Sequence, residues 1–298
     1  MSICRLSQAQ RPSSLMYFRC EAVRRYDRPS RLLRNAAGST VALPMVDRRQ
    51  ADAWQDWGVL DPLWSNLTDE GRDHGAWDLA EFWKLGEKEI AGVMSTTDRI
   101  GYPQAREEAF DFGCGVGRLT RALTAYFDRC TGVDGAESMV RLATELNRGW
   151  PCRFVRARDS DLVRFPGHSM DFVYSSFVLQ HLRDEVAVLS AIDGLAHLVR
   201  PSGLLVFQLP TSVPSRTLRG RLALRTRAYK ALRRLGISPR VLYERMRLRP
   251  PITMLAVPSD DVCTHLRSTG LRVLQVTTET FEVGPVESAT YFATPASA

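Results

Sequence analysis

An apolar strand followed by three alternate glycines constrains the fold of this chain more than any other feature. The run is Ala109-Phe-Asp-Phe-Gly-Cys-Gly-Val-Gly-Arg118, and an amphipathic helical pattern follows it directly. Glycine lets the backbone adopt left-handed conformations and lets a ligand lie against bare backbone near the positive end of a helix. The run therefore predicts a strand–turn–helix unit that holds a ligand at the turn.

The spacing of the glycines narrows the choice of ligand. A nicotinamide dinucleotide site has G-x-G-x-x-G, and Arg118 occupies the position of its third glycine. Gly113, Gly115 and Gly117, with Asp111 two residues ahead, instead resemble the first motif of class I S-adenosylmethionine-dependent methyltransferases. The resemblance implies that Asp111, the three glycines and Arg118 lie at the cofactor. For an isolated triplet, a tight turn in any α/β domain is the alternative interpretation.

Further motifs follow in the order that this resemblance implies. Residues 129–134 predict a second strand ending in Asp134, and an acidic side chain there can accept hydrogen bonds from both ribose hydroxyls. Its alternative role is to cap the helix predicted for residues 136–147. Gly-Val-Asp followed by Met139 resembles the second methyltransferase motif, which implies that Met139 also lies at the cofactor.

A third strand is predicted at residues 152–157. The loop that follows it contains the sequence Arg-Asp-Ser-Asp at residues 158–161. The resemblance implies that Asp159 and the backbone amide of Ser160 hold the adenine of S-adenosylmethionine. Asp161 competes with Asp159 for this role, and a solvated acidic loop is the alternative for both.

A fourth strand over residues 171–176 leads into a segment that resembles the family's "S-x-x-V-L-x-H". The resemblance places Ser176 and Phe177 beneath the methionine end of the cofactor. His181 is the candidate general base, because it follows a strand at the carboxyl edge of the sheet and histidine has a suitable pKa. Its alternative role is to cap or pack against the next helix, and His74 is a weaker candidate base.

The predicted fold is α/β, a Rossmann-like doubly wound sheet of seven strands with the last strand antiparallel. Residues 201–203, Pro-Ser-Gly, are expected to stop the helix before a fifth strand at residues 204–208. Helix 257–269 and strands 271–276 and 290–294 complete the pattern. The methyltransferase domain is expected to span residues 101–298.

Two segments precede this domain. Residues 1–44 are rich in Arg and Ser, and we interpret them as a disordered tail, a wrongly assigned start or a targeting peptide. Residues 45–100 contain five of the six tryptophans and a helix predicted for residues 78–94, so we expect a helical cap. Their pattern resembles a bacterial group of small-molecule methyltransferases, in which Trp77 and Trp83 would form a lid over the substrate; plain packing is the alternative.

A basic insertion is predicted at residues 211–250, which contain twelve Arg or Lys and one acidic residue. Helical spacing of its leucines predicts a basic helix, which could bind an anionic substrate, an anionic membrane surface or nucleic acid. Nucleic acid ranks lowest because aromatic residues are sparse there. A solvated helical cap is the remaining alternative.

Composition excludes several classes of protein. No apolar run approaches the roughly 18 residues of a transmembrane helix, and the six cysteines lack metal-site spacing. We therefore expect no metal and a cytoplasmic location, with or without peripheral membrane contact.

The sequence thus predicts an S-adenosylmethionine-dependent methyltransferase that acts by in-line displacement on a small-molecule or a glycan- or lipid-linked acceptor. A nicotinamide-dependent oxidoreductase and a non-catalytic binding protein with the methyltransferase fold are the alternatives.

Overall fold

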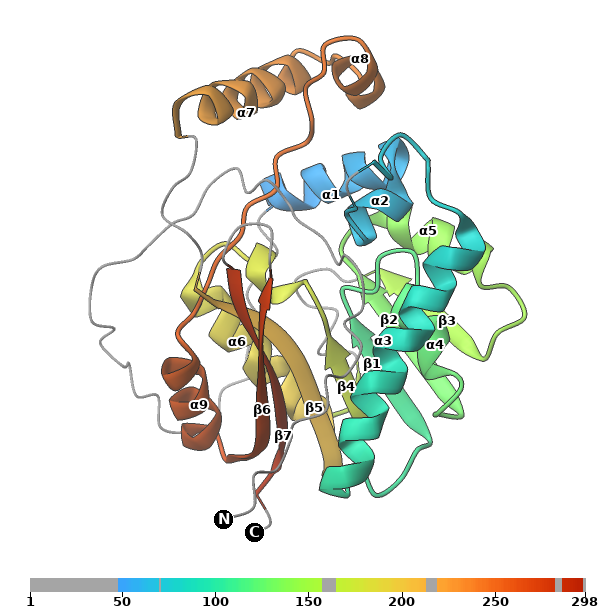
Figure 1. Cartoon of the computed structure of the whole chain (residues 1–298), viewed down its shortest axis with the longest axis vertical. Coiled ribbons are helices and arrows are strands. Elements are labelled where there is room, and N and C mark those ends of the chain that lie inside the picture. Colours follow the sequence, from blue (N-terminus) through green and yellow to red (C-terminus); the bar gives the residue numbers. More distant parts are fainter. Residues whose placement is uncertain (1–47, 70, 157–164, 213–218, 282–285, 297–298) are drawn as a thin grey trace, which may run out of the picture.

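The computed structural model describes residues 48–69, 71–156, 165–212, 219–281 and 286–296 (Figure 1). The predicted extension at residues 1–44 and the predicted adenine-side residues Asp159 and Ser160 lie outside these ranges.

A single mixed sheet of seven strands forms the centre of the described chain, in the order β3-β2-β1-β4-β5-β7-β6. β7 pairs antiparallel with both β5 and β6, whereas the other pairs are parallel. This arrangement confirms the predicted Rossmann-like α/β fold with an antiparallel last strand. The strands are β1 (Glu108–Phe112), β2 (Arg129–Asp134), β3 (Cys152–Arg156), β4 (Met170–Ser175), β5 (Val199–Ser212), β6 (Leu271–Phe281) and β7 (Val286–Pro295).

Helices cover both faces of the sheet, and each face has its own apolar cluster. One face packs on α6 (Glu185–Leu198) and α9 (Ser259–Ser268). The other packs on α3 (Leu79–Ile100) and α4 (Arg118–Leu123). α5 (Glu137–Leu146) lies against β2 and β3. β4 is buried along its whole length, as a central strand covered on both faces should be.

Several predicted boundaries differ from the structure, and two of the differences concern helix ends. α6 already ends at Leu198, and residues 201–203 lie inside β5, because Val199 pairs with Met170 across a register shift in β4. α3 continues past Met94 to Ile100 and ends at Gly101, which has a φ of 72°. Its buried Ile90 and Met94 pack in the cluster that covers the sheet, and its Phe82 and Trp83 pack in the cluster of tryptophans described below.

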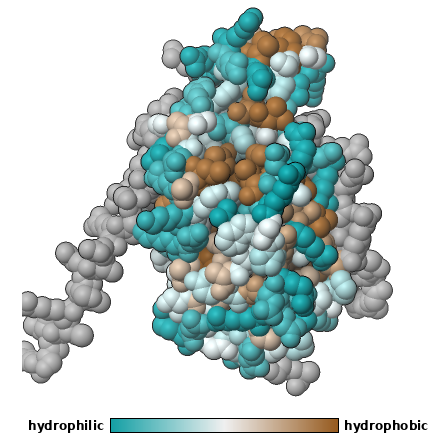
Figure 2. Space-filling view, turned by 90° about the vertical axis from the view of Figure 1, so that its right-hand side faces the viewer, coloured by the Kyte–Doolittle hydropathy of each residue, from teal (hydrophilic) through white to brown (hydrophobic). Residues whose placement is uncertain are grey.

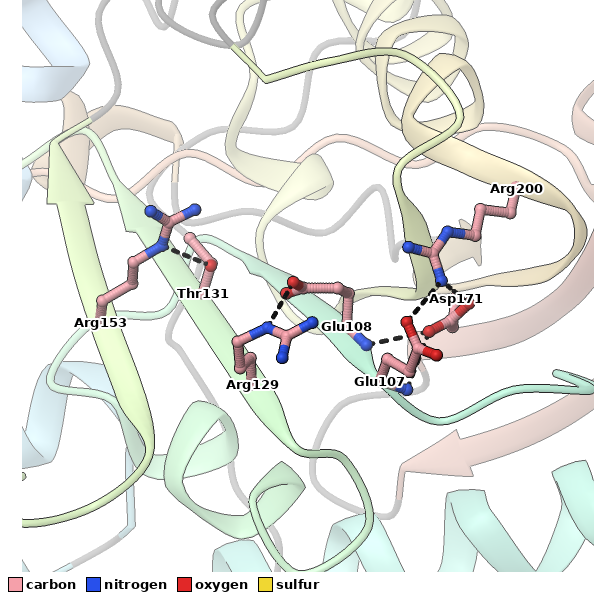
Figure 3. A network of polar contacts seen from close by, with 7 residues as sticks. All are labelled: Glu107, Glu108, Arg129, Thr131, Arg153, Asp171 and Arg200. Atoms are coloured by element: carbon pink, nitrogen blue, oxygen red, sulfur yellow. Dashed lines mark hydrogen bonds and ion pairs between the residues drawn. The ribbon is translucent and has the colours of Figure 1, made fainter.

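The amino end of the sheet is held by Asp171 at the start of β4 (Figure 3). One carboxylate oxygen accepts the backbone N–H groups of Glu107 and Glu108, both at 2.9 Å, and the other accepts Arg200 Nη1 at 2.6 Å. These bonds fix β4 against β1 at the end opposite to the glycine turn. Asp171 therefore has a structural role.

The carboxyl end of the sheet is covered by an additional helical layer. Figure 1 shows α1 (Arg48–Leu60) and α2 (Pro62–Asn66) above the sheet, and α7 (Arg219–Arg234) and α8 (Pro239–Glu244) above them. Tryptophans from α1, α2 and α3 form a third apolar cluster with Tyr243 of α8 and Met139 of α5. No helix in the described ranges is long and apolar enough to cross a membrane.

Candidate active site

The glycine turn forms one wall of a cavity at the carboxyl edge of the sheet. Gly113, Gly115 and Gly117 have φ values of 79°, 53° and 87°. A Cβ on Gly113 would lie 2.1 Å from Val178, and one on Gly115 would lie 1.7 Å from Asn66 Oδ1. Both glycines also line the cavity.

Gly117 does not line the cavity, and a Cβ there would lie 2.6 Å from Phe154 of β3. Gly117 therefore allows the start of α4 to pack closely on the sheet.

Asp134 lies where the tip of β2 meets the glycine turn. Its Oδ2 accepts the Gly115 N–H at 2.9 Å and its Oδ1 accepts the Ala136 N–H at 2.8 Å. Burial raises the pKa of this carboxyl, although both backbone bonds oppose the shift. Asp134 also lines the cavity, where each oxygen keeps a second lone pair for a ligand hydroxyl.

Asp111 lies at the base of the same cavity and is 2% exposed. Burial raises its pKa to about 7, against the hydrogen bond from Thr120 Oγ1, which donates to Oδ2 at 2.6 Å. The nearby cation of Arg118 also opposes this shift. This wall of the cavity therefore contains a carboxyl that titrates near neutral pH.

Arg118 is buried at the start of α4 and pairs with Glu89 of α3, with 2.8 Å between Nη2 and Oε2. Glu89 Oε1 accepts the hydroxyls of Tyr174 and Ser176. Gly86 makes this contact between helices possible, because a Cβ there would lie 2.7 Å from Arg118 Cγ. Arg118 Nη1 is buried without a hydrogen-bond partner among the described residues, and Arg118 lines the cavity.

His181, in the short 3-10 turn Leu179–His181, forms part of the cavity wall. Its ring lies 5.1 Å from the Trp54 ring, centroid to centroid, and its Nδ1 lies 2.6 Å from the Thr253 carbonyl oxygen. That contact places the proton on Nδ1 and leaves Nε2 as an acceptor, which lies 3.4 Å from the Gln180 side-chain Nε2. Burial lowers the pKa of His181 to about 4, so the imidazole is neutral at pH 7.

The helical layer supplies the opposite wall, but not through the tryptophans that were predicted. Trp77 and Trp83 do not line the cavity; both are buried in the third apolar cluster. Trp77 Nε1 donates to the Leu67 carbonyl at 2.9 Å, which fits the packing alternative. Trp54 of α1 and Asn66 of α2 line the cavity instead.

The structure brings most of the other predicted residues together. Met139, Ser176 and Phe177 line the cavity. His74 does not; its ring packs 4.8 Å from that of Tyr243. Among the described residues, no group of three or more His, Cys, Asp or Glu side chains is placed to hold a metal ion.

Sequence reasoning missed Glu89, Asn66 and Met254. Glu89 could have been found, because it is an acidic residue on the apolar stripe of a predicted helix, next to Ile90 and one turn after Gly86. Met254 follows the insertion, in a segment held by bonds from Leu255 N–H to the Gln180 carbonyl and from Val257 N–H to the Pro210 carbonyl. Nothing local in the sequence indicates that pairing.

The sheet order, the glycine turn and the acidic strand tip define the class I fold of S-adenosylmethionine-dependent methyltransferases. Residues 110–207 match the methyltransferase domain family, and this is the part of the chain that forms the glycine turn and the strands β1 to β5 around it.

Individual proteins agree with this assignment. An uncharacterised methyltransferase of Bacillus pumilus is 32% identical over 106 residues, which are 35% of this chain and 47% of that protein. A 2-methyl-6-phytyl-1,4-hydroquinone methyltransferase of Synechocystis is 25% identical over 156 residues, 52% of this chain and 48% of that protein. The chain thus spans about half the length of the curated relatives it matches.

A solved structure shows the same fold. It is an S-adenosylmethionine-dependent methyltransferase of Leishmania major with a TM-score of 0.54 at 13% identity, covering 82% of both chains.

Proposed function

We propose that this chain binds S-adenosylmethionine in the cavity and transfers its methyl group to a small-molecule acceptor. One observation carries the proposal: a buried guanidinium with a partnerless Nη1 lies in the wall of the same cavity as the glycine turn and the Asp134 carboxylate. A methionyl carboxylate suits Arg118, and ribose hydroxyls suit Asp134. Together with the backbone of Gly113 and Gly115, these residues would hold the cofactor.

The cofactor supplies an activated methyl group, and the remaining work belongs to the protein. In-line displacement needs the acceptor atom aligned with the methyl carbon and the leaving sulfur, in a site that excludes water. Trp54 and Met254 enclose the cavity together with Asn66, whose Oδ1 accepts the Val116 N–H of the glycine turn, and these three residues would serve both needs.

We further propose that the acceptor is apolar, which favours a small or lipid-linked molecule over a glycan. A glycan needs many polar partners, whereas the wall beyond the glycine turn is mostly apolar. Its apolar residues are Trp54, Leu67, Leu182, Pro210, Met254 and Val286.

In this proposal His181 accepts a hydrogen bond from an acceptor hydroxyl and so orients it toward the methyl group. The Thr253 carbonyl holds the required tautomer. With a pKa of about 4, His181 is neutral across the neutral pH range and is a weak base, which favours this orienting role over removal of the proton. A His181→Gln variant should then lose turnover while keeping its affinity for S-adenosylhomocysteine.

The first test is calorimetric titration of the full chain with S-adenosylmethionine, S-adenosylhomocysteine and NADH. We expect binding of both sulfur compounds and none of NADH. Binding of NADH alone would support the oxidoreductase alternative. Absence of all binding would support a non-catalytic protein that keeps the fold.

Substitution of Asp134 tests the geometry of the site. Asp134→Ala removes the proposed ribose acceptor, and we expect at least a tenfold loss of S-adenosylhomocysteine affinity, about 1.4 kcal/mol. Asp134→Asn keeps an oxygen that can accept the Ala136 N–H. Comparison of the two variants therefore distinguishes an effect on the local turn from an effect on ligand binding. Unchanged affinity in both variants would contradict the ribose assignment.

A further inference from the structure

α7 exposes an apolar stripe to solvent. Leu224 is 67% exposed, and the exposed Ala231 lies one helical repeat further on. Leu235, the residue directly after α7, is 77% exposed, and its N–H still donates to the Ala231 carbonyl as in a helix. Their spacing of seven and four residues places all three on one face of an α-helix. A single exposed leucine is ordinary, but an ordered stripe of apolar residues on a surface helix is not.

The orientation of this helix is fixed by its opposite face. Tyr229 OH donates to Asp56 Oδ2 of α1 at 2.7 Å. Arg233 binds both oxygens of the same carboxylate, at 2.8 Å from Nε and 2.9 Å from Nη2. Asp56 is buried, so this three-bond anchor holds the polar side of α7 toward the protein and the apolar stripe outward.

Positive charge flanks the stripe. Arg227, Lys230 and Arg234 are exposed, and no acidic side chain in the described ranges pairs with any of them. Residues 219–250 contain eleven Arg or Lys and only one acidic residue, Glu244.

The adjacent helix continues this surface. Val241 of α8 and Met246 just after it are 38% and 45% exposed, and Arg240 and Arg245 lie beside them. Figure 2 shows brown apolar and teal polar side chains mixed at the upper end of the molecule, where α7 and α8 lie. We call the exposed apolar and basic residues of 224–246 the α7–α8 face.

We propose that the α7–α8 face docks on an anionic lipid bilayer surface. A helix with an apolar face and basic flanks lies in the interface plane, with its apolar side chains among the acyl chains and its cations at the lipid phosphates. A second copy of this chain would present the same positive charges, which would repel. Nucleic acid would match the arginines but would leave Leu224 and Leu235 without an apolar partner.

Docking in this orientation has a functional consequence. α7 and α8 lie at the same end of the molecule as α1, whose Trp54 lines the cavity (Figure 1). The bilayer would then face the carboxyl edge of the sheet. The inference goes beyond the proposed methyl transfer and does not depend on it.

The test is sedimentation of the full chain with vesicles of phosphatidylcholine alone and of phosphatidylcholine with phosphatidylglycerol. We expect the chain to sediment with the anionic vesicles, and less so at high salt. The double variant Leu224→Ser with Leu235→Ser should bind about tenfold more weakly or worse. The triple variant Arg227→Gln, Lys230→Gln and Arg234→Gln should lose its preference for anionic vesicles.

Val186→Ser is the matched control, because Val186 is 72% exposed on α6, outside the α7–α8 face. It should bind vesicles as the unmodified chain does. The far-ultraviolet circular dichroism spectrum and the Tm of every variant report whether the fold is intact, independently of the vesicle result and of cofactor binding. Equal binding by the double variant, or no binding by the unmodified chain, would overturn the proposal. Self-association abolished by the double variant in the absence of lipid would assign the face to a second copy instead.

Discussion

At the scale of single residues, the base of the cavity contains ionisable groups whose burial is costly without a ligand. Asp111 is almost fully buried and titrates near neutral pH, and the Arg118 cation depends on Glu89 as its counter-ion. A buried carboxyl with a raised pKa, as in Asp111, is typical of functional sites. The burial of Asp111 and of the Arg118–Glu89 pair therefore affects the stability of the fold, which unfolding experiments can measure without an acceptor.

The first prediction is that the buried Asp111 carboxyl makes the stability of the ligand-free protein depend on pH. The folded-state pKa of about 7 exceeds the usual value of 3.8, so folding favours the protonated carboxyl. The protonated Asp111 carboxyl stabilises the fold fully below about pH 4. This stabilisation is lost as the pH rises through about 7, and the loss in the free energy of unfolding is about 4 kcal/mol at most. Asp111→Asn should remove this loss, so that the ligand-free variant gains stability relative to the unmodified chain between pH 5 and pH 8.

Urea unfolding at several pH values measures this difference. Asp128→Asn serves as a control, because Asp128 is exposed at the end of the same βαβ unit. Parallel stability profiles for Asp111→Asn and the unmodified chain would show that the Asp111 carboxyl is ionised at neutral pH.

The second prediction concerns the buried ion pair between Arg118 and Glu89. Glu89→Gln leaves the Arg118 guanidinium buried without its counter-ion, which costs about 3–5 kcal/mol in such sites. Glu89 keeps some solvent contact, so we expect the lower end of that range. A ligand carboxylate would restore the missing charge, so S-adenosylhomocysteine should raise the Tm of the variant more than that of the unmodified chain.

Glu87→Gln is the matched control, since Glu87 is exposed on the same helix. Thermal unfolding with and without ligand measures both quantities. An equal ligand-induced shift in Glu89→Gln and the unmodified chain would mean that the ligand carboxylate does not contact Arg118.

At the scale of secondary-structure elements, the strands were predictable and the helical layer was not. The apolar runs of β1, β2 and β4 and the glycine turn between β1 and α4 encode their structure locally. β6 and β7 extend well beyond the predicted residues because they pair with each other along their whole length, which requires no apolar pattern.

Residues at the site show the same division. Asp111, Asp134 and Arg118 belong to a local motif and were predictable. Trp54 lines the cavity while Trp77 does not, and this depends on how α1 and α2 fold back on the sheet, which no local pattern in the sequence specifies.

The anchoring of α7 leads to a third prediction. Asp56→Asn replaces a charged acceptor of three hydrogen bonds with a neutral side chain that can accept fewer of them. α7 should then detach more often, and trypsin should cleave within residues 225–234 about tenfold faster. S-adenosylhomocysteine affinity should change little, because Asp56 does not line the cavity.

Asp98→Asn is the comparison for this experiment. Asp98 pairs with Arg106 in an ion pair that is largely exposed, so its loss should leave the cleavage rate unchanged. Equal cleavage rates for Asp56→Asn and the unmodified chain would show that α7 is held by other contacts.

At the scale of the whole molecule, the cavity lies between the carboxyl edge of the sheet and the helical layer that covers it, and these two parts differ in structure. One wall is the carboxyl edge of a continuous sheet with apolar clusters on both faces. The other wall comes from α1, α2 and the segment after α8, which share the third cluster. The segment after α8 meets the rest of the site through few backbone bonds, such as that from Leu255 N–H to the Gln180 carbonyl.

A ligand that contacts both walls must therefore stabilise the second wall more than the first. Amide hydrogen exchange with and without S-adenosylhomocysteine tests this fourth prediction. We expect slower exchange in α1, in α2 and at Leu255, and little change in β6 and β7, whose ladder is complete without ligand. NADH should produce no protection. Protection limited to the glycine turn and β2 would mean that the ligand contacts only the sheet, and that the helical layer closes the cavity through the acceptor instead.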